Sequence, residues 1–176
     1  MSGAALGPNA DGLTAADRCG HGRTMNKREP SPMQLALVEA RDAGARGEVP
    51  VGAVVVDGRT GHVVAAAGNR VEELADPSAH AEILVLREAA AGAGRPRLDG
   101  MDLYVTLEPC AMCAAAIALA RVRKLVFGAY DAKMGGVEHG VRLFDQPTCH
   151  HRPEVVGGVE ETESAALMKE FFKNKR

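Results

Sequence analysis

The stretch that most constrains the fold is the nearly continuous apolar run from Val51 to Val56, in which valine predominates. β-Branched residues favour strands, and a strand without polar alternation is typical of one buried on both faces of a sheet. The turn-forming segment 57–61 follows, and residues 62–67 then predict a second strand, antiparallel to the first. We therefore expect a β-hairpin inside a sheet that is covered on both sides.

Helical and strand patterns alternate through the rest of the chain. Ser31 suits an N-cap and Pro32 the first helical position, which predicts a helix from there to about Arg46, ended by Gly47. Further helices are expected from 76 to about 92, from 109 to 120 and from about 160 onward, and further strands at 103–107, 124–129 and 155–156. This alternation predicts an α/β fold, a three-layer α/β/α sandwich with a central mixed five-stranded sheet.

Length and composition indicate one domain. A chain of 176 residues with 46% hydrophobic content fits a single globular unit, which we expect over residues 29–176. Residues 1–28 are rich in Gly, Ala, Asn and Asp without apolar periodicity, and we expect a disordered extension there. The sequence contains no apolar run near the roughly 20 residues that a membrane span needs, and its N-terminus lacks an apolar signal region, so no membrane association is expected.

Charge and cysteine usage narrow the setting. The formal net charge of −2 gives no overall signal for nucleic acid, so RNA binding would depend on a local basic patch. The four cysteines are Cys19, Cys110, Cys113 and Cys149, and only two of them are close together. Isolated cysteines fit a reducing cytoplasm better than a disulfide framework, and we expect a cytoplasmic protein.

Two short segments carry metal-binding chemistry, His80-Ala81-Glu82 and Pro109-Cys110-Ala111-Met112-Cys113. One imidazole and two thiolates are ligands that Zn²⁺ prefers, and three protein ligands leave a fourth tetrahedral position open, as in catalytic zinc sites. Cys110 and Cys113 share one face at the start of the expected helix, where the helix dipole favours thiolates. We therefore predict one Zn²⁺ bound by His80, Cys110 and Cys113.

Glu82 follows the histidine by two residues, within reach of a water molecule in the open position. Two thiolates weaken Zn²⁺ as a Lewis acid, so a nearby base is needed. We hypothesise that Glu82 takes the proton of the water, passes it to a ring nitrogen as the water attacks an amidine carbon, and helps to protonate the departing ammonia.

Neither segment is specific by itself. A Cys-x-x-Cys pair is often a redox pair or half of a structural zinc site, so a non-catalytic zinc-stabilised RNA-binding or interaction module is an alternative. That module needs a fourth protein ligand and no role for Glu82. The segment Cys149-His150-His151 could supply such a ligand or a second metal site, although we favour ordinary loop or core residues there.

Together the segments form the known His-x-Glu … Pro-Cys-x-x-Cys signature of zinc-dependent nucleobase deaminases. From about Pro32 to Arg176 the chain further resembles the bacterial tRNA-specific adenosine deaminases, which convert the wobble adenosine of an anticodon loop to inosine. The stretches that carry this resemblance are GEVPVGAVVV (47–56), GNR (68–70), DPSAHAEILVLR (76–87), LYVTLEPCAMCAAAI (103–117), VFGAYDAK (126–133) and LMKEFFKNKR (167–176).

The resemblance implies a cytidine deaminase-like fold that works as a homodimer on a tRNA anticodon stem-loop. It implies that Asn69 hydrogen-bonds the flipped base and that Val49 forms an apolar wall beside it. Asp131 and Lys133 match a loop near the RNA, and Lys175 and Arg176 match a basic helix end that contacts the anticodon stem. A loop nucleotide is already partly unstacked, so extruding it costs less than flipping a base out of a duplex.

Two positions depart from the common pattern of this family. Tyr130 stands where many members have arginine, and Val137-Glu138-His139-Gly140 replaces a small Gly-Ser segment. A deaminase of a free base or nucleoside, such as guanine, cytosine or cytidine, is the nearest alternative because it shares the zinc chemistry. Salt dependence separates the two, since RNA binding weakens steeply with ionic strength.

Overall fold

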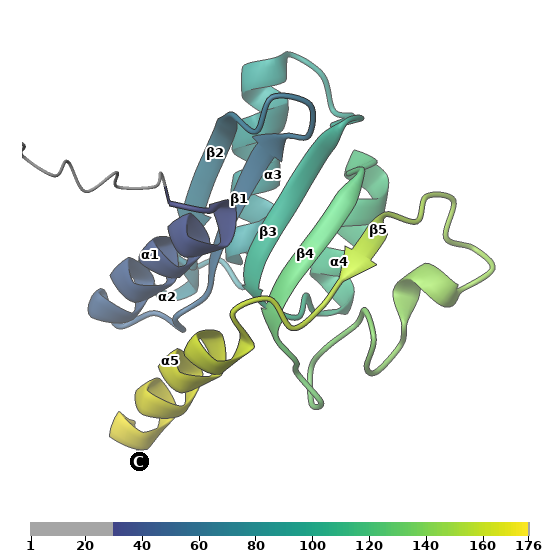
Figure 1. Cartoon of the computed structure of the whole chain (residues 1–176). Helices are drawn as coiled ribbons and strands as arrows, with labels where there is room; N and C mark the ends of the chain where they lie inside the picture. Colours follow the sequence, from purple (N-terminus) through teal and green to yellow (C-terminus); the bar gives the residue numbers. More distant parts are fainter. Residues whose placement is uncertain (1–29, 176) are drawn as a thin grey trace, which may run out of the picture.

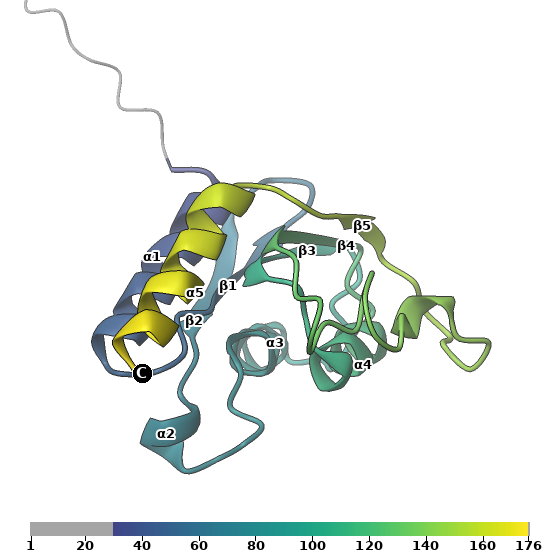
Figure 2. The ribbon, with the colours of Figure 1, turned by 90° about the horizontal axis from the view of Figure 1, so that it is seen from below.

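The computed structural model describes residues 30–175, which form a five-stranded sheet between two layers of helices (Figures 1 and 2). The elements are α1 (Pro32–Ala45), β1 (Gly52–Asp57), β2 (Val63–Gly68), α2 (Val71–Leu74), α3 (Ala81–Ala93), β3 (Met101–Leu107), α4 (Ala111–Ala120), β4 (Lys124–Ala129), the 3₁₀ turn η1 (Leu143–Asp145), β5 (Glu154–Val156) and α5 (Glu161–Asn174). The expectation for residues 1–28 falls outside the described residues.

The sheet is mixed, as predicted. Its strand order is β2-β1-β3-β4-β5. β1 pairs antiparallel with both β2 and β3, whereas β3, β4 and β5 run parallel to one another. The three-layer α/β/α architecture is therefore confirmed. Among the described residues, no helix is both long and apolar enough to cross a membrane.

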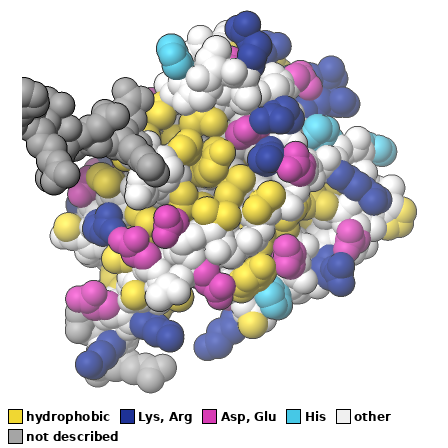
Figure 3. Space-filling view, viewed as in Figure 1, with side chains coloured by type: hydrophobic (Ala, Val, Ile, Leu, Met, Phe, Trp, Pro, Cys, Tyr) yellow, Lys and Arg dark blue, Asp and Glu magenta, His cyan; other side chains and the backbone are white. Residues whose placement is uncertain are grey.

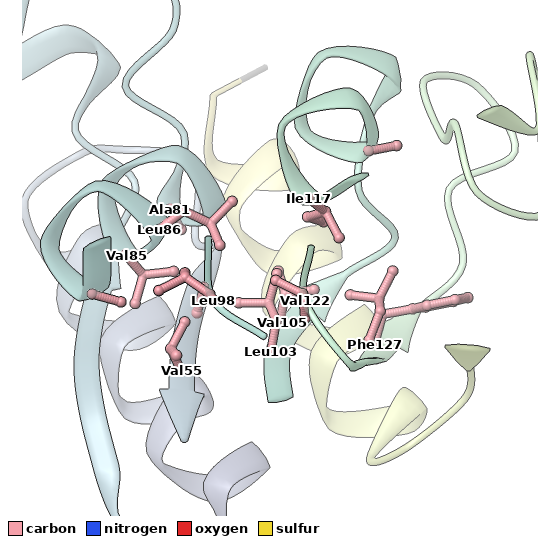
Figure 4. Packing of buried hydrophobic residues seen from close by; sticks show 14 of the residues in the cluster. Val55, Ala81, Val85, Leu86, Leu98, Leu103, Val105, Ile117, Val122 and Phe127 are labelled. Atoms are coloured by element: carbon pink, nitrogen blue, oxygen red, sulfur yellow. The ribbon is translucent and has the colours of Figure 1, made fainter. Parts of the chain in front are cut away.

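Each face of the sheet carries its own helices. α1 and α5 lie side by side on one face, and α3 and α4 cover the other (Figure 2). The larger core lies under α3 and α4, where strand side chains such as Val55, Leu103 and Phe127 pack with Val85 and Ile117 of the helices (Figure 4). Burial of each such side chain contributes roughly 1.5–3 kcal/mol.

A smaller core lies on the opposite face. Met33 and Ala36 of α1 contact Val54 and Val56, while Val55 points into the larger core. The side chains of consecutive valines thus pack into the cores on opposite faces of the sheet, which confirms a strand buried on both faces. In the space-filling view of the α1–α5 face, hydrophobic side chains gather over the strands and charged side chains lie around them (Figure 3).

The helix α1 begins as predicted. Ser31 Oγ accepts a hydrogen bond from Gln34 N, and Gln34 Oε1 accepts one from Ser31 N, which completes a capping box. The helix ends before Gly47, whose φ of +87° is readily adopted by glycine.

Two predicted helix starts were wrong. The second long helix begins at Ala81 and not at Asp76, because Asp76 Oδ1 accepts hydrogen bonds from Ser78 N and Oγ and closes a turn instead. The next begins at Ala111 and not at Pro109, because Pro109 O accepts from Gly136 N and the backbone of Cys110 is extended. The short helix α2 was not predicted.

Four chain segments meet at one edge of the sheet. Gly52 at the start of β1 pairs with Gly68 at the end of β2. Leu107 and Ala129, which end the parallel strands β3 and β4, pair at the same edge because Ala53 pairs with Val105. The connections 46–51, 69–80, 108–110 and 130–142 are therefore brought together there. This end of the sheet holds the start of β1 and the carboxyl ends of β2, β3 and β4, and α/β sheets bind ligands at the carboxyl ends of their strands.

Candidate active site

His80 and Cys110 hold equivalent positions at the ends of two helices. Each is an N-cap with extended backbone, His80 before α3 and Cys110 before α4. Cys113 lies in the first turn of α4 and is fully buried. Both helices thus direct their N-terminal ends toward one point, where their dipoles stabilise negative charge.

The three predicted ligands converge. Cys110 Sγ lies 3.7 Å and Cys113 Sγ 3.5 Å from His80 Nδ1, and all three ligand atoms lie within 4.8 Å of one another. With Zn–S and Zn–N bonds of about 2.3 and 2.05 Å, a tetrahedral centre separates sulfur from nitrogen by about 3.6 Å. The donor set and its spacing therefore fit Zn²⁺ with one coordination position left over.

The electrostatics of the two cysteines differ. Hydrogen bonds from Cys113 and His80 lower the pKa of Cys110 to about 4, although its burial acts in the opposite direction. The hydrogen bond to Cys110, together with burial, raises the pKa of Cys113 well above its usual range. Without metal the pair therefore shares one proton, and a metal ion that takes both thiolates must displace it.

Glu82 is placed for proton transfer. It is the second residue of α3 and only 4% exposed, and it lines the same pocket as His80 and Cys110. Burial raises the pKa of Glu82, because a carboxylate is disfavoured away from water. A carboxyl group with a raised pKa suits a group that must both accept and release a proton near neutral pH.

A pocket of about 300 Å³ opens over this cluster, near the lower limit for small-molecule sites. It is formed at the sheet edge described above. The sequence-predicted residues that line it are Val49, Asn69, His80, Glu82, Cys110, Asp131 and Lys175.

Two predicted RNA contacts stand apart from the pocket. Lys133 is exposed and absent from the lining, although its N–H donates to Asp131 Oδ1. Arg176 falls outside the described residues. Asp131 Oδ1 also accepts from Met134 N, so this carboxylate shapes its own loop.

Two buried glutamates at the pocket were missed. Glu48 is 2% exposed and accepts hydrogen bonds from Asn69 Nδ2 and Glu73 N. Glu108 is equally buried and accepts from four backbone N–H groups and the His139 ring. The available signal was a glutamate directly beside an apolar strand pattern, in GEVPV and in TLEPC.

The departures at 130 and 137–140 form one structural unit. The Tyr130 ring packs edge-on against Phe127, with centroids 5.1 Å apart, and against His139, with centroids 5.9 Å apart. His139 in turn bonds Glu108, and Val137 is buried in the core. Tyr130 and His139 therefore brace the loop over the pocket.

The segment Cys149-His150-His151 does not extend the metal cluster. Cys149 Sγ donates to His151 O, and His151 Nε2 donates to Val122 O. Within residues 30–175, the group of potential metal ligands contains only His80, Cys110 and Cys113. The interpretation of 149–151 as loop residues agrees with these contacts.

Comparisons with known proteins agree with this geometry. Residues 26–129 match the cytidine and deoxycytidylate deaminase zinc-binding region. The tRNA-specific adenosine deaminase of Agrobacterium fabrum is 61% identical over 145 residues, covering 82% of this chain and 93% of that protein. The Bacillus subtilis protein of the same name is 45% identical over 144 residues, covering 82% and 88%.

Solved structures place the chain in the same group. One, from a study of A-to-I editing by tRNA:A34 deaminases at the wobble position, is 60% identical with a TM-score of 0.75, covering 77% of this chain and 97% of that one. A guanine deaminase from Nitrosomonas europaea is 26% identical with a TM-score of 0.70, covering 81% and 84%. The chain therefore belongs to the tRNA-specific adenosine deaminases, a group of hydrolytic deaminases that contain the zinc-binding region of the cytidine and deoxycytidylate deaminases.

Proposed function

We propose that this protein deaminates the wobble adenosine of a tRNA anticodon loop to inosine. The observation that carries the proposal is the convergence of His80, Cys110, Cys113 and buried Glu82 in one pocket. Two relatives support it: a tRNA-specific adenosine deaminase that is 61% identical, and a protein from a study of tRNA:A34 deaminases that is 60% identical.

Bound by His80, Cys110 and Cys113, Zn²⁺ supplies a Lewis acid that makes water nucleophilic at neutral pH. Glu82 accepts the proton of the attacking water and delivers it to N1 of adenine as a C–O bond forms at C6. Glu82 then transfers the proton of the new C6 hydroxyl group to the exocyclic nitrogen, which leaves as ammonia when the C6–N bond breaks and the C6 carbonyl forms. Water is consumed, inosine and ammonia are formed, and Glu82 returns to its starting state.

The remaining pocket residues are proposed to hold the substrate. Val49 packs against the extruded base, and Asn69 hydrogen-bonds the nucleoside. Asp131 and Lys175 contact the RNA at the rim, and Lys133, which is outside the pocket lining, contacts it from the loop that it shares with Asp131. Arg176 is included from the sequence alone. The pocket lies beside the predicted metal ligands, where a base stacked in a helix could not enter, and this favours a nucleotide that has left its stack.

We also propose a cytoplasmic homodimer, with residues 29–176 as its catalytic domain and 1–28 as an extension. Met112 and Leu119 lie seven residues apart on the outer side of α4, with exposed fractions of 39% and 81%. Apolar side chains at this spacing share a helix face and favour burial against a second subunit. Light scattering coupled to size-exclusion chromatography measures the assembly, and Leu119→Lys is expected to weaken it.

The test is inosine and ammonia release from an anticodon stem-loop with a wobble adenosine. Free adenosine, guanine and cytidine are assayed in parallel, together with a stem-loop carrying guanosine at the wobble position. We expect turnover of the first substrate only, and none by Glu82→Ala with its zinc content unchanged. Turnover of a free base alone would show that the substrate assignment is wrong, while the proposed roles of zinc and Glu82 would still apply. Normal turnover by the variant would refute the role of Glu82.

A further inference from the structure

The side chain of Glu48 bridges two hydrogen-bond donors beneath the pocket. Its Oε2 accepts from Asn69 Nδ2 at 3.0 Å, and its Oε1 accepts from Glu73 N, in α2, at 2.9 Å. Glu48 and Asn69 are only 2% and 5% exposed. Both residues line the pocket that contains His80 and Glu82.

This contact determines which way the Asn69 amide faces. Glu48 Oε2 is the acceptor of this hydrogen bond, so the NH₂ group of Asn69, and not its oxygen, faces Glu48. The backbone of Asn69 is fixed as well, because its N–H donates to Val51 O and its carbonyl accepts from Arg46. The side chain therefore has one orientation.

The oxygen of the amide is left for a ligand. Within residues 30–175, Asn69 Oδ1 forms no hydrogen bond, and the only buried side-chain N or O atoms without a partner are Asp102 Oδ1 and Ser164 Oγ. Asn69 Oδ1 is therefore reachable from the pocket that its residue lines.

We propose that Glu48 is a positioning residue that orients Asn69 so that Oδ1 accepts a hydrogen bond from the substrate nucleoside. This inference rests on the proposed function. The wobble adenosine offers its exocyclic amino group and its ribose 2′-hydroxyl group as donors. The amide orientation then makes position 69 an acceptor at a fixed place, which lowers the entropy lost on binding.

A glutamine cannot take the place of Glu48 without a consequence at Asn69. The backbone N–H of Glu73 requires an acceptor, so the amide oxygen of a glutamine at position 48 would face it and the amide nitrogen would face Asn69. Asn69 must then rotate its amide by 180° to present Oδ1 to that donor. The pocket would receive an NH₂ group where the wild-type protein has an oxygen.

Four variants test this assignment on the zinc-loaded protein with the stem-loop substrate: Glu48→Gln, Asn69→Ala, and the double variants E48Q/N69A and E48Q/N69D. We expect Glu48→Gln to reduce kcat/KM by about tenfold or more, the effect of one misdirected buried hydrogen bond. In the Asn69→Ala background, Glu48→Gln should cause no further loss, because Glu48 acts through the amide. In E48Q/N69D, the carboxylate introduced at position 69 accepts from the amide introduced at position 48 and still presents an oxygen to the pocket, so at least tenfold of the lost activity should return.

Two results would overturn the proposal: an equal loss from Glu48→Gln with and without the Asn69 amide, or no recovery in E48Q/N69D. The comparison of E48Q/N69D with Glu48→Gln does not involve Asn69→Ala, so it tests the proposal even if Asn69→Ala does not fold. Zinc content and melting temperature are measured for each variant. If wild-type protein deaminates a free base and not the stem-loop, the proposed function fails, and the same four variants test Glu48 on that base. A stem-loop with 2′-deoxyadenosine at the wobble position separates the ribose hydroxyl from the amino group as donor.

Discussion

The ring of His139 lies 2.7 Å from Glu108 Oε2, and this contact links the loop after β4 to the residue two positions before Cys110. The same carboxylate accepts from the backbone N–H groups of Asp131, Val137, Glu138 and His139. Burial raises the pKa of Glu108, but these hydrogen bonds outweigh it and hold the pKa below its usual value. One buried anion therefore organises the loop that closes one side of the pocket.

Replacement of Glu108 by alanine is expected to destabilise the zinc-loaded protein strongly. It leaves four backbone N–H groups without their acceptor, one buried and three part-buried, and an unsatisfied buried donor costs about 1–3 kcal/mol. We therefore expect a total loss on the order of 3 kcal/mol or more. The free energy of unfolding in urea measures it. Glu138→Ala is the matched control, because Glu138 is an exposed acid in the same loop, and it should change stability by less than about 0.5 kcal/mol. Equal stability of the two variants would contradict this role of Glu108.

Metal removal is expected to lower the melting temperature and to expose a reactive thiol. A ligand that binds only the folded state stabilises it by mass action, so a chelator should remove that contribution and added Zn²⁺ should restore it.

Because the pKa of Cys110 is lowered to about 4 in the metal-free protein, its alkylation by iodoacetamide should vary little between about pH 6 and 8. An unperturbed thiol would react roughly tenfold faster per pH unit over most of that range. Peptide mass spectrometry measures the rate at Cys110, and protection by Zn²⁺ is the control.

Local patterns were sufficient for the strands and for the group of candidate metal ligands. The valines at 54–56 identified a strand buried on both faces, because β-branched runs have few alternative structures. His80, Cys110 and Cys113 were predicted as ligands because the two segments occur together in one chain, although neither segment is specific by itself. Because β1 pairs antiparallel with both β2 and β3, the segments after β2 and β3 lie at one end of the sheet, which brings His80 and the two cysteines together without any further local signal.

Contacts between distant segments could not be predicted in the same way. The helix starts were placed too early because Asp76 and Pro109 are good helix openers, while their actual partners, Ser78 and Gly136, decide the local backbone. Glu48 and Glu108 were overlooked for a similar reason. A glutamate in a sequence reads as a surface residue unless the donors that satisfy it are known, and those donors lie 21 to 31 positions away.

Gly52 is expected to tolerate no side chain. A Cβ atom at this position would lie 2.1 Å from Ala36 O and 2.5 Å from Ala40 N, both in the backbone of α1. Gly52→Ala should therefore force α1 away from β1 and destabilise the protein by about 1–3 kcal/mol. Gly92→Ala is the control, because Gly92 lies in α3 with open space around it and alanine favours the helix by about 1 kcal/mol. Thermal and urea unfolding measure the change in the free energy of unfolding for both variants, which should have opposite signs. An unchanged free energy of unfolding in Gly52→Ala would show that α1 can move freely.

Lys175 is expected to contribute one RNA contact at the pocket rim. Its Nζ lies 3.3 Å from Gly47 O and 4.5 Å from the centre of the Phe171 ring, so the ammonium group is held beside the pocket that the residue lines. A phosphate contact at this place releases a counterion, so Lys175→Ala should weaken stem-loop binding and reduce the slope of log K against log salt by about one. Binding is measured between about 50 and 200 mM salt in the Glu82→Ala background, which prevents turnover.

Lys124→Ala is the matched control, because Lys124 pairs with Glu154 at the opposite end of β4. If both lysine variants leave the slope unchanged, Lys175 does not contact phosphate, and its ammonium group serves only to fix the end of α5 against the 47–49 segment.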